Sequence, residues 1–366
     1  MKIAVYTICR NEKKNILPWL ENVEDADIAV VGDTGSNDGS AELLRGNGAL
    51  VFPIHVSPWR FDEARNRLLR LLPEDVDVCV SLDFDERLSP GWRSAIERAW
   101  AGGAARLSYD YIEKNPNIQN HTVKIVSSRI HARAGYIWIY PVHELLSYTG
   151  QGQERQAYAE GLTVTHMPDP SKDRTPYLAL MELAAAENPD DARILHQLGR
   201  DYMQSGHYDK CIETMWLAAA LTTIPDEQRR ACTRFIARAY GGKKNYLKAR
   251  KYLQKLIAEA PFCSAAYVEH VILSYQFDEW DDIIALSKRF GDIDFEYKSI
   301  YNEFASHEGT LCDITSIAFY HRAEYGTALE YALKALEKES TSERIKQNAE
   351  TFEYLLKAQQ EEPLHE

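Results

Sequence analysis

The chain has 366 residues, of which 45% are hydrophobic and 27% are charged, and its formal net charge is −13. This length allows two folded domains, and the composition excludes a disordered or fibrous chain. No apolar run reaches the roughly 20 residues that span a bilayer and no secretory cleavage site follows the start, so we expect a cytoplasmic protein without membrane contact, and the acidic excess disfavours generic nucleic-acid binding.

Residues 1–170 alternate short apolar runs with helical segments, which predicts an α/β domain. Buried strands are expected at residues 3–8, 28–31, 49–54 and 76–82. Helices are expected at residues 15–22, from Ser40 onward, and at 61–72. Segments of β-like composition return at residues 106–111, 123–129 and 135–140. We place the end of this domain near residue 170.

Residues 171–187 are expected to form a connecting helical segment, and residues 188–366 a second domain with helical periodicity. Its clearest unit has apolar and small residues at helix-turn-helix spacing: Leu195, Leu198, Gly199, Tyr202, Cys211, Met215 and Ala218. The small residues Gly199 and Cys211 allow two helices to approach closely. Similar units follow, and the spacing resembles tetratricopeptide repeats, whose stacked helix pairs share one core.

Two carboxylates, Asp83 and Asp85, come directly after the predicted strand 76–82. Ligands of open α/β sheets bind at the carboxyl ends of strands. Side chains two positions apart on an extended chain point the same way, so we expect both carboxylates on one side. Hard oxygen ligands in that arrangement suit a divalent cation that carries a diphosphate. The alternative is a solvated acidic turn.

Three further polar segments, residues 7–12, 31–40 and 140–144, lie where predicted strands end. In chain order the motifs are Thr7 with Arg10-Asn11-Glu12, Asp33-Thr34-Gly35-Ser36-Asn37-Asp38-Gly39, Ala64-Arg65-Asn66 and Asp83-Phe84-Asp85-Glu86. This order resembles the family 2 glycosyltransferases over about residues 1–170. Arg129-Ile130-His131 and the segment 138–144 look like a subgroup in which such a domain precedes tetratricopeptide-like repeats. The resemblance implies a GT-A fold, a Rossmann-like domain that binds a nucleotide sugar.

The resemblance also implies a nucleotide-diphosphate sugar as donor, with a UDP-sugar favoured, and Mn²⁺ or Mg²⁺ to neutralise the leaving diphosphate. It assigns the donor site to Thr7, Arg10, Glu12, Asp33, Arg65, Asp83, Lys172 and Arg174. Asp85 and His166 would bind the metal ion. A carboxylate near the acceptor hydroxyl can accept its proton, and we expect Glu144 to be this base, with His143 as second choice.

Structural roles compete with these assignments. Asp33 could cap the helix that follows its turn. His143 and Glu144 could form a buried structural pair, and His166 could be an ordinary loop histidine. The alternating aromatic residues Tyr136, Trp138 and Tyr140 suit either a core strand or a platform on which a sugar stacks.

The expected activity is an inverting, metal-dependent glycosyl transfer to a macromolecular acceptor, with peptide or protein as first choice. The alternative acceptor is a hydroxymethylated base in DNA. It is favoured by a basic run that could bind a polyanion: Arg234, Arg238, Lys243, Lys244, Lys248 and Lys251. Such a run is otherwise a solvated helix face. An alternative of another class is a non-catalytic adaptor, whose repeats bind a partner while the first domain is vestigial.

Overall fold

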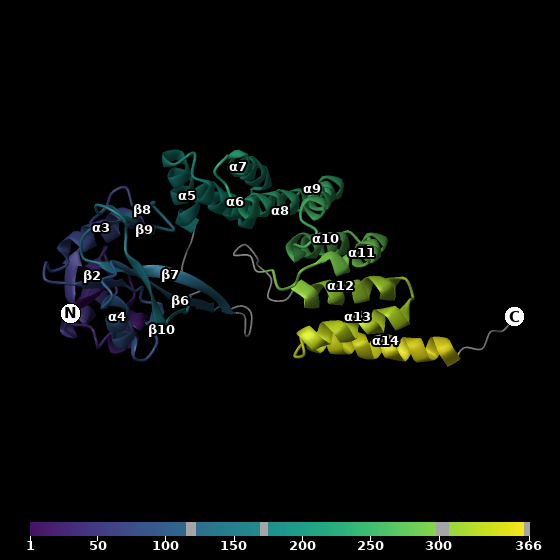
Figure 1. Ribbon diagram of the computed structural model, residues 1–366, viewed down its shortest axis with the longest axis horizontal. Coiled ribbons are helices and arrows are strands. Elements are labelled where there is room, and N and C mark those ends of the chain that lie inside the picture. Colours follow the sequence, from purple (N-terminus) through teal and green to yellow (C-terminus); the bar gives the residue numbers. More distant parts are fainter. Residues whose placement is uncertain (115–121, 169–174, 298–306, 362–366) are drawn as a thin grey trace. The chain divides into compact units, whose positions relative to one another are not determined.

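The computed structural model describes residues 1–114, 122–168, 175–297 and 307–361. The chain divides into two compact units, Met1–Ala184 and Ala185–Glu366. We call them the α/β unit and the helical unit (Figure 1). They follow the predicted order, in which a mixed α/β region precedes a helical one.

The α/β unit contains an eight-stranded sheet in the order β3-β2-β1-β4-β7-β6-β10-β5. Four neighbouring parallel strands are β1 (Ile3–Cys9), β2 (Ile28–Asp33), β3 (Leu50–Pro53) and β4 (Val78–Ser81). Next to β4 the sheet continues with β7 (Thr122–Ala132), β6 (Arg106–Lys114), β10 (Gln156–His166) and β5 (Glu86–Leu88). Because β7 pairs antiparallel with β4, it brings residues from far along the chain next to the end of that strand.

Both faces of the sheet are covered, which explains why β1 is apolar at almost every position. Ile3 and Val5 face a core with α1 (Lys13–Asn22), α2 (Ser40–Gly46) and α4 (Trp92–Trp100). Ala4 and Tyr6 face the opposite core, formed with α3 (Phe61–Leu71) and a two-stranded ribbon of β8 (Tyr136–Ile139) and β9 (Leu145–Tyr148). The period of two in a strand therefore divides β1 between two cores.

The helical unit is a succession of helices in which each helix packs on the next. The helices are α6 (Ala192–Gln204), α7 (Tyr208–Ala220), α8 (Asp226–Gly242), α9 (Tyr246–Glu259), α10 (Ser264–Gln276), α11 (Trp280–Ser287), α12 (His307–His321), α13 (Tyr325–Lys338) and α14 (Glu343–Glu361). Helix α5 (Thr175–Glu187) precedes them. The unit begins with a capped helix, because the Asp191 carboxylate accepts hydrogen bonds from the amides of Arg193 and Ile194 at 2.9 and 3.1 Å.

Close approach between the paired helices depends on small residues, as predicted. A Cβ atom on Gly199 of α6 would lie 2.7 Å from Met215 Cε of α7. Cys211 of α7 is fully buried in the same pair. Within the described ranges, no helix is long and apolar enough to cross a membrane.

Candidate functional site

The site lies at the carboxyl ends of β1 and β4, which are neighbours in the sheet. Thr7 in β1 is buried, and its hydroxyl donates a hydrogen bond to Asp83 Oδ1 at 3.0 Å. Asp83 follows β4 by two residues. The predicted strand 76–82 therefore delivers Asp83 to the sheet edge that the sequence indicated.

Arg65 of α3 connects two of the expected site residues. Its Nη2 donates to Asp83 Oδ1 and Oδ2 at 2.9 and 3.1 Å, and its Nε donates to Glu144 Oε1 at 2.5 Å. The guanidinium carbon lies 5.1 Å from the centre of the Trp138 ring. Arg65 is buried, so packing and charge fix its position together.

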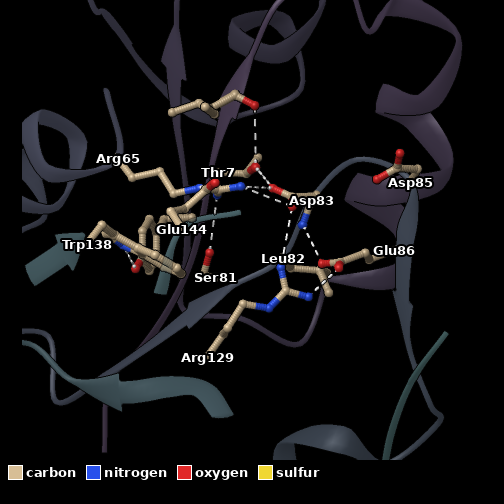
Figure 2. Close-up of polar contacts among 12 residues, drawn as sticks. Thr7, Arg65, Ser81, Leu82, Asp83, Asp85, Glu86, Arg129, Trp138 and Glu144 are labelled. Carbon is tan, nitrogen blue, oxygen red and sulfur yellow. Dashed lines mark hydrogen bonds and ion pairs between the residues drawn. The ribbon is translucent and has the colours of Figure 1, made fainter. Parts of the chain in front are cut away.

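Arg129 of β7 approaches Asp83 from another direction (Figure 2). Its Nη1 lies 3.4 Å from Asp83 Oδ2, and its Nη2 forms an ion pair with Glu86. Glu86 also accepts hydrogen bonds from the Asp83 amide and from the Tyr111 hydroxyl, each at 2.8 Å. We call Asp83, Glu86, Glu144, Arg65 and Arg129 the carboxylate–arginine cluster.

In this cluster two guanidinium groups face three carboxyl groups. Burial opposes ionisation of Asp83, but the charges of Arg65 and Arg129 outweigh it and hold the pKa of this carboxyl well below its ordinary value. The Asp83 carboxylate is therefore ionised and bound by guanidinium groups on both oxygens. Glu144, the expected base, accepts a hydrogen bond from Arg65, while His143 is exposed and has a φ of 50°.

Asp85 does not join Asp83, so the prediction that both carboxylates point the same way is wrong. The chain turns after Asp83, and the Glu86 amide donates to the Asp83 carbonyl at 2.9 Å. In Figure 2 Asp85 lies apart from the cluster. Its Oδ2 is 3.6 Å from Nε2 of His166. Burial opposes protonation of His166, but the contact with Asp85 outweighs it and raises the pKa of the imidazole above its ordinary value.

The structure separates Asp85 from Asp83, but it places the two predicted metal ligands, Asp85 and His166, next to each other. Across the described residues, no group of three or more His, Cys, Asp or Glu side chains is placed to hold a metal ion. Mn²⁺ or Mg²⁺ binding by Asp85 and His166 stays an untested prediction.

Asp33 lies at the end of β2, but it does not cap α2. Its carboxylate accepts a hydrogen bond from the Ser36 amide at 3.2 Å, which closes the turn after the strand. The Asp38 carboxylate instead accepts hydrogen bonds at the first residues of α2 and α1, from the amides of Ser40 at 2.9 Å and Lys13 at 3.1 Å. These bonds join the loop after β1 to the loop after β2.

The remaining donor-site predictions have separate positions. Arg10 is exposed, whereas Glu12 is buried and accepts a hydrogen bond from Asn15 Nδ2 at 2.8 Å. Lys172 and Arg174 lie outside the described residues. Of the predicted donor site, the contacts around Asp83 therefore gather Thr7 and Arg65.

Trp138 belongs to the core, so the alternative of a sugar-stacking platform is wrong for this residue. Its indole Nε1 donates to the Tyr6 hydroxyl at 3.0 Å, and the Tyr6 oxygen lies 2.8 Å from His131 Nε2. His131 Nδ1 lies 2.8 Å from the Ala132 carbonyl, which can only accept. The proton of His131 is therefore on Nδ1, and Tyr6 donates to Nε2. Burial lowers the pKa of His131 to about 3.

Sequence reasoning assigned no role to Arg129, Glu86 or Tyr111. Arg129 and Glu86 stand inside quoted motifs, but their contact depends on the position of β7 beside β4. The segment 127–131 is polar apart from Ile130, so the charge of Arg129 gave no distinct signal in the sequence.

Of the basic run in the helical unit, only some side chains are exposed and unpaired with an acidic residue among the described residues. Arg234 is 4% exposed, Arg238 forms an ion pair with Glu269, and Lys243 forms one with Asp209. Arg234 therefore does not belong to an exposed polyanion site. Lys244, Lys248 and Lys251 are exposed.

Comparison with known proteins finds partial likenesses to repeat proteins. No family model and no curated protein matches the chain. A crystal structure of MamA protein is 20% identical, covers 44% of this chain and 81% of its own, and has a TM-score of 0.34. PilF of Pseudomonas aeruginosa is 14% identical, with a TM-score of 0.35, and the match covers 48% of this chain and 72% of PilF. TTC0263, a tetratricopeptide-repeat protein of Thermus thermophilus, is 16% identical, with a TM-score of 0.35, and the match covers 48% of this chain and 88% of TTC0263.

The expected membership in the family 2 glycosyltransferases is wrong. The structural neighbours reported are tetratricopeptide-repeat proteins, and no glycosyltransferase fold is found among them. The prediction of a metal-dependent sugar transfer, whether to a peptide, a protein or DNA, is wrong as well. A GT-A domain is not shown, whereas an α/β region followed by tetratricopeptide-like helices is. The motifs misled because short polar segments at strand ends are common to many open α/β sheets.

Proposed function

We propose that this chain is a repeat adaptor that binds a protein partner through its helical unit. The observation that carries the proposal is a continuous layer of helices. Besides packing on its neighbour in the chain, α6 contacts α8, α8 contacts α10, and α10 contacts α12. The first helices of successive pairs therefore lie side by side, and stacked helix pairs of this kind present extended binding surfaces. We call α6, α8, α10 and α12 the first-helix layer.

Exposed aromatic side chains on this layer support a protein partner. Tyr275 near the end of α10 is 42% exposed, and Tyr320 near the end of α12 is 36% exposed. Tyrosine gives a large contact area together with a hydroxyl that can form a hydrogen bond, and it is enriched where proteins bind one another. Two such residues at corresponding helix ends suit a partner that lies across several repeats.

The carboxylate–arginine cluster supports a structural role for the α/β unit. Asp83 and Glu144 both accept hydrogen bonds from Arg65, and Asp83 also faces Arg129. These contacts connect α3 and β7 to the segment that follows β4. In this proposal the unit is a folded support for the repeats.

The test is affinity capture with the full-length chain, followed by hydrogen exchange on the captured complex. We expect a retained protein that protects amides in the helical unit. Replacement of both Tyr275 and Tyr320 by alanine should weaken its binding about tenfold, as expected when two interface tyrosines are truncated. Tyr354→Ala, at an exposed tyrosine of α14, is the matched control and should not weaken binding.

Two outcomes would contradict the proposal that this chain is an adaptor. One is a retained protein that protects amides of the α/β unit and none in the helical unit. The other is retention that is equal for the wild type and the Tyr275→Ala/Tyr320→Ala variant.

A further inference from the structure

One side of α9 carries lysines in succession up to Glu259, the last residue of the helix. Lys248, Lys251 and Lys255 lie in the helix at spacings of three and four residues, which bring side chains to one side of it, and Lys244 lies two residues before the helix. All four are exposed. The segment 229–255 contains no aspartate or glutamate. We call these four lysines the basic face of α9.

The arginines of the same segment are used inside the helical unit. Arg238 pairs with Glu269, and Arg250 pairs with Asp282. In the part of the chain that the structure describes, Lys244 and Lys251 form no ion pair. The charge left toward solvent is therefore carried by lysine ammonium groups, which act as point charges and do not present a planar fork.

Apolar side chains adjoin the basic face. Leu247 of α9 is 76% exposed and stands on the same side of the helix as Lys251. On α7, Trp216 is also exposed. The Trp216 ring meets the Tyr252 ring edge-on at 5.9 Å, which connects α7 to α9.

An aromatic stack continues this surface toward α8. Tyr252 of α9 stacks on Tyr240 of α8, with ring centres 5.6 Å apart and planes 5° apart. Lys248 Nζ lies 5.1 Å from the centre of the Tyr240 ring. The exposed surface thus combines positive charge with aliphatic and aromatic contacts across three helices.

We propose that the basic face of α9 docks an acidic segment of a partner protein, in which carboxylates alternate with apolar side chains. This proposal rests on the adaptor function and gives the adaptor a second binding surface. Charge complementarity is the main argument: four lysines, of which Lys255 pairs with Glu259, are exposed on a chain whose net charge is −13. An acidic partner is repelled by most of the molecule and attracted here, which favours binding in one place.

The exposed leucine of α9 favours a peptide over a nucleic acid. Leu247 is aliphatic, and it can pack against a leucine or phenylalanine side chain but cannot stack on a base as an aromatic ring does. The guanidinium groups of Arg238 and Arg250, which suit phosphate, already bind carboxylates.

The experiment is fluorescence anisotropy with the full-length chain and defined probes. The probes are a labelled peptide that alternates glutamate pairs with leucine and phenylalanine, its glutamine counterpart, a single-stranded oligothymidylate, and vesicles of phosphatidylserine and phosphatidylcholine. We expect the glutamate peptide to bind at least about tenfold more tightly than the glutamine peptide, and its affinity to fall as salt rises.

Variants locate the binding. Lys248→Glu/Lys251→Glu should weaken the glutamate peptide about tenfold or more, because two attractions become repulsions. Lys346→Glu/Lys357→Glu changes two lysines of α14 whose side chains are 43% and 65% exposed, and it should have no effect. Leu247→Ala, at an exposed position that the fold does not need, should weaken the peptide about threefold or more, a loss that a purely ionic contact would not show.

Three outcomes would overturn the acidic-segment proposal: equal binding of the two peptides, no effect of Lys248→Glu/Lys251→Glu, or tighter binding of the oligothymidylate or the vesicles. The adaptor proposal is tested by a separate experiment. If a captured partner depends on Tyr275 and Tyr320 but not on Lys248 and Lys251, the adaptor function holds and the α9 docking site is wrong.

Discussion

Arg65 binds Asp83 and Glu144 at once, with its Nη2 2.9 Å from Asp83 Oδ1 and its Nε 2.5 Å from Glu144 Oε1. The two carboxylates are far apart in the chain, and α3 supplies the cation between them. A buried charge pair is weak evidence for net stabilisation, but removal of one partner leaves the other charge uncompensated. Arg65 is therefore the residue whose loss most directly tests the carboxylate–arginine cluster.

Arg65→Leu should lower the free energy of unfolding of the α/β unit by about 3 kcal/mol or more, because Asp83 and Glu144 lose their shared cation. Urea denaturation of the full chain measures this change. Arg70→Leu, at an exposed arginine of the same helix, is the control and should change the unfolding free energy by less than about 0.5 kcal/mol. Equal effects of the two variants would show that the cluster does not hold the fold.

His131 should give the α/β unit a pH-dependent stability. Its folded pKa is about 3, whereas an unfolded histidine titrates near about 6.5. Between these values the unfolded chain binds one more proton at this residue, so stability falls as the pH falls below about 6.5. His131→Gln removes this proton, and the slope of unfolding free energy against pH should decrease by about 1.4 kcal/mol per pH unit between pH 4.5 and pH 6. Parallel curves for the wild type and the variant would contradict the neutral, buried His131.

The strands and helices were largely predictable, because their signals are local. The predicted strands at residues 3–8 and 76–82 correspond to β1 and β4 within two residues at each end, and Gly199 faces Met215 as its spacing indicated. The relation between Asp83 and Asp85 was not predictable from alternation. Side chains two positions apart point the same way only on an extended chain, and the turn at residues 83–86 separates these two side chains.

The partners of Asp83 depend on tertiary structure. Arg129 reaches it because β7 pairs antiparallel with β4, with Val80 opposite Ile130. A register between strands so distant in the chain is not encoded in either strand alone. The family assignment failed for a related reason: residue types at strand ends were matched without knowledge of the side chains that surround them. Arg65 illustrates this, since it binds Asp83, which was expected to bind a donor, and Glu144, which was expected to be the base.

Gly199 allows α6 and α7 to approach, and a larger residue should separate them. Gly199→Val should lower the free energy of unfolding of the helical unit by about 2 kcal/mol, because the new methyl groups overlap the buried Met215 side chain. Gly291→Val is the control, since no atom lies within 4 Å of a Cβ built there, and it should change stability by less than about 0.5 kcal/mol. Thermal unfolding measures both, and a neutral Gly199→Val would mean that the helix pair adjusts without cost.

Asp282 connects three helices of the helical unit through its carboxylate. Its Oδ2 lies 2.9 Å from the hydroxyls of Tyr246 and Ser274 and 2.8 Å from His270 Nε2, and Arg250 pairs with Oδ1. Asp282→Asn should lower the free energy of unfolding by about 2 kcal/mol at pH 7, because the ionised acceptor is lost. Asp281→Asn changes the exposed neighbour of Asp282 and should cost less than about 0.5 kcal/mol.

The pH dependence of this difference separates the charge of Asp282 from its shape. Burial opposes ionisation of Asp282, but the contacts with His270, Tyr246 and Ser274 outweigh it and lower the pKa of the carboxyl below its ordinary value. The folded pKa is then below the unfolded one, so the stabilisation is fully present above about pH 4 and is lost as the pH falls toward the folded pKa. The gap between wild type and Asp282→Asn, measured by urea denaturation, should therefore narrow on acidification below about pH 4. A gap that is constant with pH would show that the asparagine disturbs packing rather than removing a charge.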